Sequence, residues 1–379
     1  MVQNRADQRI TKIMKNIKIA IILGTRPEII KMSPVIKECK RLKLNYFIIH
    51  TGQHYSYDMD KVFFKELELM HPKYNLKVGS GSHGVQTGRM LAQIEKILID
   101  EKPQIVLVQG DTNSVLAGAL AASKLHIKVG HIEAGLRSHD RTMPEEINRI
   151  LVDHISDFAF VPTLPAKNNL INEGIGKKNI YITGNSVVDS VYQNVKLAKK
   201  KSHVLKALKL NSQKYFLVTL HRAENVDDKT RLTSIINGLR LLSDYHRLPI
   251  IWPMHPRTQK MVQKFSLINL INKDKFINII EPVGFLDFIM LEANAGLIMT
   301  DSGGVQEEAC ILKIPCLTLR DNTERPESVD VGANVLVGTD SDKMFLASKK
   351  MTQKTASWSC PFGDGTAAEQ IIKIILKNN

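Results

Sequence analysis

The feature that most constrains the fold is a regular alternation of short apolar runs and amphipathic stretches, repeated in two halves of the chain. The apolar runs are rich in β-branched residues and nearly continuous, which is typical of strands covered on both faces. Alternation of this kind predicts parallel, doubly wound α/β sheets with right-handed crossovers. The 379-residue length fits two such domains.

The predicted elements can be given as residue ranges. In the first half, strands are expected at 17–23, 46–50, 105–109, 128–132, 158–161 and 180–183. The helices between them are expected at 33–42, 58–67, 85–100, 114–125 and 145–155. In the second half, strands are expected at 215–220, 249–252, 277–280, 296–300 and 315–319.

A lysine-rich stretch at 199–213 predicts the boundary between the two domains. We expect an N-terminal domain at 1–198, a C-terminal domain at 199–364 and a final helical segment at 365–379. Ligands of doubly wound domains bind at the carboxyl ends of the strands, so the sequence predicts a site in the cleft where these ends face each other.

Composition excludes several classes of protein. With 43% hydrophobic and 24% charged residues the chain is neither disordered nor fibrous, and no apolar run approaches the ~18 residues needed to span a membrane. Residues 1–16 lack the apolar core of a signal peptide. The four cysteines are scattered along the chain, which favours reduced thiols in the cytoplasm. A zinc site at Cys310 and Cys316 is not expected, because no further cysteine or histidine lies at zinc-ligand spacing from them. The net charge of +14 is spread along the chain, which favours an anionic small molecule over nucleic acid.

One glycine-rich segment, GSGSHG at 79–84, matches the G-x-G-x-x-G pattern of dinucleotide sites. In a nicotinamide site the pattern follows the first strand, and an acidic residue ends the second strand. Here the first strand ends in the single glycine Gly24, while Asp100 and Glu101 close a predicted helix. We therefore interpret 79–84 as a loop and predict no cofactor and no metal.

The first predicted strand leads into GTRPEIIK at 24–31. Glycine permits a tight turn, Pro27 suits the first turn of a helix, and the backbone amides there attract anions. Arg26 and Lys31 add positive charge, so the segment predicts a phosphate cradle. Taken alone, it would rather indicate an ordinary strand-to-helix turn with solvated basic residues.

A second predicted anion site follows the strand at 296–300, in the sequence DSGGVQEEA. Ser302 offers a hydroxyl, and two consecutive glycines, Gly303 and Gly304, allow a diphosphate to approach the helix amides. Glu308 lies on the same helix, where its carboxylate can accept from both ribose hydroxyls. Capping by Asp301 or Ser302 is the alternative, but capping does not require paired glycines. The downstream segment DNTERPE offers Arg325 to the same pocket.

A third set of residues is acidic. Asp111 and Glu133 follow strand ends, and Glu145 lies in a loop-to-helix transition. Single carboxylates at such positions are usually surface groups or caps, but three at one sheet edge indicate acid–base chemistry. In the second half, the strand at 215–220 places His221 at its carboxyl end.

Motifs in this order resemble the non-hydrolysing UDP-N-acetylglucosamine 2-epimerase family from about Ile17 to the C-terminal helix. They are GTRPEIIKMSPVI, HTGQHY, VQGDTNSVLAGALAA, HIEAGLRS, MPEEINR, TGNSVVD, HRAEN, PMHPRT, TDSGGVQEEA and DNTERPE. The resemblance implies two Rossmann-like domains of glycosyltransferase-B type, with the helix at 367–377 crossing back onto the first domain.

The resemblance also implies residue roles. The family's catalytic positions correspond here to Asp111, Glu133, Glu145 and His221. Its nucleotide-sugar positions correspond to Arg26, Lys31, Phe288, Ser302, Gly303, Gly304, Glu308 and Arg325. Among these, Arg26 and 302–304 are implied to contact the diphosphate, Glu308 the ribose and Phe288 the uracil.

Bacterial members can hold a second, activating UDP-N-acetylglucosamine. That site corresponds here to Gln53, Arg89, Arg222 and His255, together with Glu145. Ser56 stands where those enzymes have a second glutamine, which predicts weak or absent activation.

The expected reaction interconverts UDP-N-acetylglucosamine and UDP-N-acetylmannosamine. No carbonyl adjoins C2, so its hydrogen is not acidic, and epimerisation requires either oxidation by a nicotinamide or elimination across C1–C2. The sequence provides cations and helix amides for departing UDP and carboxylates for the proton, which favours elimination to 2-acetamidoglucal. Which carboxylate serves which face is left open. We expect a cytoplasmic homodimer with no nucleic-acid or membrane partner.

Four rival functions remain at this point. A hydrolysing epimerase would release free N-acetylmannosamine, and a 2,3-diacetamido-sugar 2-epimerase would take a different sugar. A glycosyltransferase would share the fold and the UDP pocket but would require an acceptor. A non-catalytic UDP-sugar sensor would retain the glycine pair and Glu308 without the acids.

Overall fold

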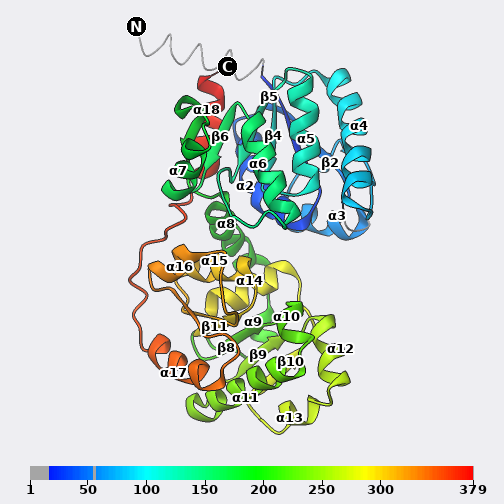
Figure 1. Cartoon of the computed structure of the whole chain (residues 1–379). Coiled ribbons are helices and arrows are strands. Elements are labelled where there is room, and N and C mark those ends of the chain that lie inside the picture. Colours follow the sequence, from blue (N-terminus) through cyan, green and yellow to red (C-terminus); the bar gives the residue numbers. More distant parts are fainter. Residues whose placement is uncertain (1–16, 54–56, 379) are drawn as a thin grey trace. The chain divides into compact units, whose positions relative to one another are not determined.

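The computed structural model describes residues 17–53 and 57–378. The chain divides into two compact units, of which unit 1 runs to Gln193 and resumes at Phe362, while unit 2 spans Asn194–Pro361. The first boundary lies within α8 (Ser186–Lys201). Each unit is built around its own sheet (Figure 1). No helix in the described ranges is long and apolar enough to cross a membrane.

The sheet of unit 1 has seven strands in the order β3-β2-β1-β4-β5-β6-β7, and all neighbours pair in parallel. This is the doubly wound order, which reverses between β1 and β4, and folds of this kind bind ligands beyond the strand ends at that point. The strands are β1 (Lys18–Leu23), β2 (Asn45–His50), β3 (Tyr74–Asn75), β4 (Ile105–Gln109), β5 (Lys128–Ile132), β6 (Phe158–Val161) and β7 (Ile180–Ile182).

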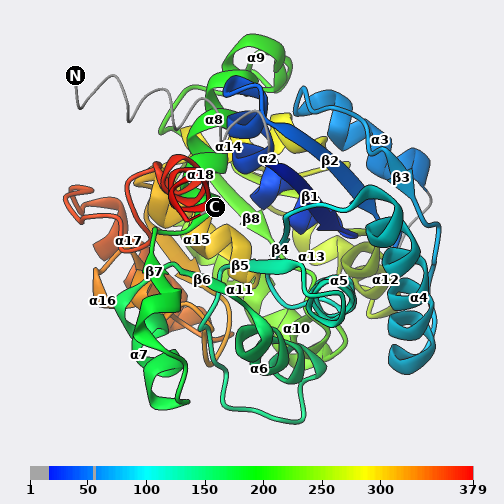
Figure 2. The same ribbon diagram turned by 90° about the horizontal axis from the view of Figure 1, so that it is seen from above.

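Helices cover both faces of this sheet. Apolar side chains of α4 (His83–Glu101), α5 (Asn113–Lys124) and α6 (Pro144–Ile155) share one core with alternate residues of the strands. Figure 2 shows α4 and α5 running side by side. On the other face, α2 (Arg26–Arg41) packs against α3 (Tyr57–Glu66) and against the C-terminal helix α18 (Ala367–Lys377). A smaller core lies under α7 (Leu164–Asn172).

Unit 2 repeats the plan with six parallel strands in the order β10-β9-β8-β11-β12-β13. They are β8 (Phe216–Thr219), β9 (Ile250–Pro253), β10 (Ile277–Ile280), β11 (Leu297–Thr300), β12 (Cys316–Thr318) and β13 (Asn334–Leu336). One face is covered by α11 (Lys229–His246), α12 (Pro256–Lys264), α13 (Ile268–Asn272) and α17 (Ser341–Thr352). The other is covered by α9 (Val204–Ala207), α14 (Phe285–Asn294) and α15 (Gly303–Leu312). Two short helices, α10 (Ala223–Val226) and α16 (Pro326–Asp330), lie in loops.

The predicted fold class is confirmed, and all eleven predicted strands are present. The edge strands β3 and β13 were missed, since two and three residues are too short to give an apolar run. Two helix starts were wrong. Helix α2 begins at Arg26 rather than residue 33, with Pro27 in its first turn and Pro34 tolerated inside it. Helix α4 begins at His83, so the end of the glycine-rich segment is helical rather than loop.

Candidate functional site

The predicted site residues follow the carboxyl ends of the central strands in each unit. In unit 1, Arg26 opens the helix after β1, Asp111 follows β4 and Glu133 follows β5. In unit 2, His221 follows β8 and Ser302 follows β11. Each sheet reverses its order at one strand pair, β1/β4 in unit 1 and β8/β11 in unit 2, where doubly wound domains bind ligands. Glu133 follows β5, the strand next to β4.

The turn after β1 is closed by a buried carboxylate that the sequence analysis did not single out. Glu28 accepts hydrogen bonds from the backbone N–H of Gly24 (2.8 Å) and Thr25 (2.7 Å) and from the hydroxyl of Thr112 (2.7 Å). Burial raises the pKa of Glu28, against these hydrogen bonds. Two amides that were expected to face an anion are therefore occupied. Gly24 is required for close packing, since an added Cβ would lie 2.0 Å from the Thr51 hydroxyl.

The two predicted cations of this turn have different surroundings. Lys31 does not stand in the phosphate cradle as a solvated charge, because its Nζ lies 2.8 and 2.9 Å from the two carboxylate oxygens of Glu133. Arg26 is half-buried, and its guanidinium carbon lies 5.2 Å from the centre of the Phe63 ring.

Glu133 is held from several sides. Besides Lys31, it accepts from the side-chain amides of Gln109, at the end of β4, and Asn185 (3.4 Å). Its backbone has φ of +69°, a left-handed conformation that is unfavourable for a non-glycine residue and that these contacts maintain. The loop after β4 lies close to Glu133, since an added Cβ at Gly110 would lie 3.8 Å from a carboxylate oxygen of Glu133. The ends of β4 and β5 thus bring the Asp111 loop beside Glu133.

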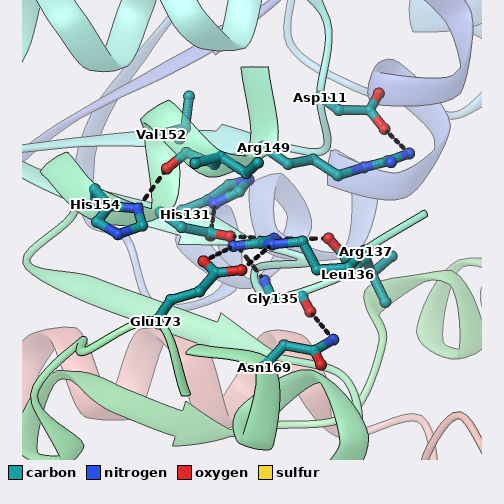
Figure 3. A network of polar contacts seen from close by, with 12 residues as sticks. Asp111, His131, Gly135, Leu136, Arg137, Arg149, Val152, His154, Asn169 and Glu173 are labelled. Atoms are coloured by element: carbon teal, nitrogen blue, oxygen red, sulfur yellow. Dashed lines mark hydrogen bonds and ion pairs between the residues drawn. The ribbon is translucent and has the colours of Figure 1, made fainter. Parts of the chain in front are cut away.

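Asp111 pairs with a helix that carries another predicted acid. Its carboxylate lies 2.5 Å from Arg149 of α6 (Figure 3). Its carbonyl accepts from the side-chain amide of Asn148 at 2.8 Å. Arg149 also bonds Glu146 at 2.9 Å, and Glu146 accepts from two backbone amides of the preceding loop. Glu145, the neighbour predicted from sequence, is half-buried in the first turn of α6, where helix amides favour a negative charge.

Two residues of the predicted second nucleotide site lie in unit 1. Gln53 is buried, and its side-chain oxygen accepts from the backbone and hydroxyl of Ser114 (3.2 and 2.7 Å). Arg89 is exposed on α4, and Gln86 of the same helix donates to the carbonyl of Gln53 at 2.9 Å. Ser56 lies outside the described residues.

In unit 2, a buried aspartate organises the loop after β8. Asp301 was considered in the sequence only as a cap for α15. Instead, its carboxylate accepts from the backbone N–H of His221 (3.0 Å) and Arg222 (2.8 Å) and lies 3.2 Å from Nδ1 of His221. Burial would raise the pKa of Asp301, but the His221 contact and these amides lower it.

The other half of the predicted second site lies beside this loop. The ring centres of His221 and His255 are 5.7 Å apart, so the HRAEN and PMHPRT motifs meet. Burial and the neighbouring His221 lower the pKa of His255.

The predicted diphosphate site lies at the start of α15. Ser302 is the N-cap residue, and its side chain makes no capping hydrogen bond. The space beside Gly303 and Gly304 is open, because an added Cβ would find no described atom nearer than 3.8 Å. Arg325 is joined to this helix, with its Nε 2.8 Å from Glu307.

The predicted ribose and uracil positions are on neighbouring helices. Glu308 is half-buried on α15, and Phe288 on α14 packs against the core. A fully buried carboxyl group, Glu292 of α14, faces Glu308. Burial, together with the charge and hydrogen bond of Glu308, raises the pKa of Glu292 well above its ordinary value.

Unit 2 also contains a cavity that lies away from the predicted site residues. The cavity, of about 540 Å³, is lined by residues of α11, α17 and the segments after β12 and β13, and includes no predicted site residue. Across the described ranges, no three His, Cys, Asp or Glu side chains gather as metal ligands would.

Comparison with known proteins identifies the family. The family model described as UDP-N-acetylglucosamine 2-epimerase matches residues 37–376. The chain belongs to this family. It is 57% identical to a UDP-N-acetylglucosamine 2-epimerase of Methanocaldococcus jannaschii over 94% of this chain and 98% of that protein. It is 43% identical to a UDP-2,3-diacetamido-2,3-dideoxy-D-glucuronate 2-epimerase of Pseudomonas aeruginosa, over 95% and 99% of the two chains.

Solved structures of this 2-epimerase family share the fold. The crystal structure of the Methanocaldococcus jannaschii UDP-GlcNAc 2-epimerase in complex with UDP-GlcNAc and UDP matches with a TM-score of 0.82 and 56% identity. It covers 95% of this chain and 100% of that one. The Neisseria meningitidis UDP-GlcNAc 2-epimerase bound to UDP-GlcNAc matches with a TM-score of 0.84 at 33% identity, over 96% and 100% of the chains.

Several residues that organise the candidate site were missed from sequence. Glu28, Asp301 and Glu292 are buried carboxyl groups whose partners are distant in sequence or are backbone amides. A further buried group consists of His131 and Arg137, both of which contact Asp153. Figure 3 labels His131 and Arg137. A usable signal was a charged or polar residue inside the buried part of a strand or on the apolar face of a helix, as at His131 in β5.

Proposed function

We propose that this protein is a non-hydrolysing UDP-N-acetylglucosamine 2-epimerase that interconverts UDP-N-acetylglucosamine and UDP-N-acetylmannosamine. Identity of 57% over nearly the full length to an enzyme of that name supports the substrate. The observation that carries the chemistry is Glu133, a carboxylate at a strand end that is paired with Lys31 and lies beside the Asp111 loop.

The proposed reaction begins with loss of UDP from C1 and of the proton from C2, which forms a C1–C2 double bond. The electron pair of the C2–H bond forms that double bond while the pair of the C1–O bond leaves with UDP. UDP then adds back at C1 and a proton returns to the opposite face of C2. No net oxidation occurs, so no nicotinamide is needed.

The two units have separate proposed roles. Unit 2 binds the nucleotide, with Ser302, Gly303 and Gly304 at the diphosphate, Glu308 at the ribose and Phe288 near the uracil. Helix amides and Arg325 stabilise the departing diphosphate. Unit 1 supplies Asp111, Glu133 and Glu145 for proton transfer, and Lys31 keeps Glu133 in its ionised form. His221, fixed by Asp301, acts on a proton or on the leaving group.

Incubation with UDP-N-acetylglucosamine alone, with products resolved by NMR, tests the proposal. UDP-N-acetylmannosamine should form without added nicotinamide, with the gluco compound in excess because its C2 substituent is equatorial. Free N-acetylmannosamine as the main product would contradict the non-hydrolysing assignment. Turnover only of a 2,3-diacetamido substrate would contradict the proposed sugar.

The second nucleotide site remains a separate proposal. Gln53, Arg89, Arg222 and His255 are its residues, and Ser56 predicts weak or absent activation by UDP-N-acetylglucosamine. The reverse reaction, started from pure UDP-N-acetylmannosamine, should therefore proceed without a trace of the gluco compound. An absolute requirement for that trace would contradict this prediction.

A further inference from the structure

A histidine with no role in the proposed reaction, His131, contacts the loop that carries Asp111. His131 is the penultimate residue of strand β5, and its side chain is fully buried. Its ring nitrogens each contact an oxygen: Nδ1 lies 2.6 Å from a carboxylate oxygen of Asp153, and Nε2 lies 2.8 Å from the carbonyl oxygen of Gly110. Figure 3 shows this ring at the centre of a polar network within unit 1.

The identity of the two partners determines how many protons the ring carries. A carbonyl oxygen can only accept a hydrogen bond, so Nε2 must carry a proton. The Asp153 carboxylate is an acceptor as well, because its other oxygen accepts from Arg137 (2.8 Å) and from the backbone N–H of Gly135 (3.2 Å). Nδ1 must then also carry a proton. A ring protonated on both nitrogens is an imidazolium.

Charge balance within the network agrees with an imidazolium. Arg137 is bound by Asp153 and by Glu173, whose carboxylate oxygens lie 2.7 and 2.6 Å from the guanidinium nitrogens (Figure 3). With His131 charged, two cations face two carboxylates in a region where an uncompensated charge is costly.

The pKa of His131 agrees with the geometry. Burial alone would lower it, but Asp153 of α6, the Gly110 carbonyl after β4 and the charge of Glu133 together raise it. Arg137, in the loop after β5, is the other cation that faces the carboxylate of Asp153.

The network joins the segments that carry the proposed acids. Gly110, whose carbonyl is bound by His131, immediately precedes Asp111, and its N–H bonds the carbonyl of Ile132, the residue before Glu133. Asp153 binds the backbone of Gly135, two residues after Glu133, and belongs to α6, which also carries Arg149, the partner of Asp111. Glu133 (φ +69°) has a left-handed backbone, which is unfavourable for a residue with a side chain and is held by such contacts.

We propose that His131 is a permanently charged imidazolium that, with Asp153, positions the Asp111 and Glu133 loops for proton transfer. The positioning role rests on the proposed function of those two acids, whereas the charge state does not. His131 itself touches no substrate in this proposal. It is a positioning residue.

The charge state is tested on the unaltered protein by NMR of nitrogen-15-labelled histidine, with the His131 signals assigned by their loss in His131→Gln. Both ring nitrogens should show the protonated shift and a bound proton at pH 7, and neither should titrate with the exposed histidines. An unprotonated ring nitrogen on His131 at pH 7 would overturn the proposal. This readout is independent of enzyme activity, so it also stands if the proposed reaction fails.

The positioning role is tested by kinetics. His131→Gln should lower kcat by roughly 10²-fold, as expected for misplaced catalytic groups, while UDP affinity and the KM for substrate change little. The matched control is His154→Gln, an exposed histidine on α6 whose Nδ1 contacts only its own helix, and it should match the parent.

A double variant separates positioning from a general loss of stability. If His131 acts through the acids, His131→Gln should lower kcat much less in a Glu133→Gln background than in the parent. Equal losses in both backgrounds, or an unchanged kcat in His131→Gln, would overturn the positioning role. Should His131→Gln fold poorly, Asp153→Asn provides the second variant, and the same non-additive result is expected.

Discussion

The ammonium nitrogen of Lys31 lies 2.8 Å from one carboxylate oxygen of Glu133 and 2.9 Å from the other. The lysine comes from the second turn of α2 and the acid from the end of β5, so the pair joins two elements on opposite sides of the reversal in strand order. Both side chains are largely removed from water, which strengthens their attraction. The cation after β1 and the acid after β5 therefore belong to one site.

The Lys31–Glu133 pair predicts a coupled effect on stability. Lys31→Met leaves a buried carboxylate without its cation and should lower the free energy of unfolding by about 1–3 kcal/mol. Adding Glu133→Gln should recover part of that loss, because a neutral amide does not need the cation. Urea denaturation of both variants measures this, with exposed Lys40→Met as the control. Strictly additive losses would show that the two side chains do not interact.

The acids are expected to act in chemistry and not in nucleotide binding. Glu133→Gln, Glu145→Gln and Asp111→Asn keep the side-chain shape but abolish proton transfer, so each should reduce turnover by roughly 10²–10⁴-fold. UDP affinity should stay near that of the parent, and Glu95→Gln on the exposed face of α4 should leave both unchanged. A variant with normal turnover removes that acid from the mechanism.

Nucleotide affinity should depend on Arg26 and Glu308. Removing either side chain deletes a charge-assisted contact worth ~1.5–3 kcal/mol, so Arg26→Ala and Glu308→Ala should each weaken UDP binding by about one to two decades. Calorimetry with UDP measures the change, with exposed Lys206→Ala as the control. Unchanged affinity in both variants would place the nucleotide elsewhere.

Glu292 predicts a pH dependence of stability. Its pKa in the folded protein is raised well above the ordinary 4.5, because it is buried beside Glu308. The folded state therefore holds a proton that the unfolded state releases once the pH exceeds 4.5, and this group's contribution to stability falls as pH rises toward the folded pKa. Glu292→Gln should flatten that fall and be more stable than the parent at alkaline pH. The melting temperatures of the parent and of Glu292→Gln, measured between pH 6 and pH 9, test this prediction. If the melting temperatures of the two proteins change with pH in parallel, the prediction is contradicted.

The sequence predicted elements and strand ends well because these depend on local patterns. Apolar runs gave the central strands, and the strand order placed Asp111, Glu133, His221 and Ser302 at carboxyl ends. It could not predict side-chain pairing across elements. Lys31 was assigned to a phosphate, yet its partner is a residue 102 positions away. Asp301 was considered as a helix cap, yet it binds the backbone of the loop after β8.

The most direct test of the central claim is the fate of the C2 hydrogen in deuterated water. Elimination gives that proton to a carboxylate, where it exchanges with solvent before a proton returns to the opposite face. UDP-N-acetylmannosamine formed from UDP-N-acetylglucosamine should therefore carry deuterium at C2 by NMR, and UDP with 2-acetamidoglucal should accumulate slightly on long incubation. Product that retains the original hydrogen at C2 would contradict elimination and indicate hydride transfer instead.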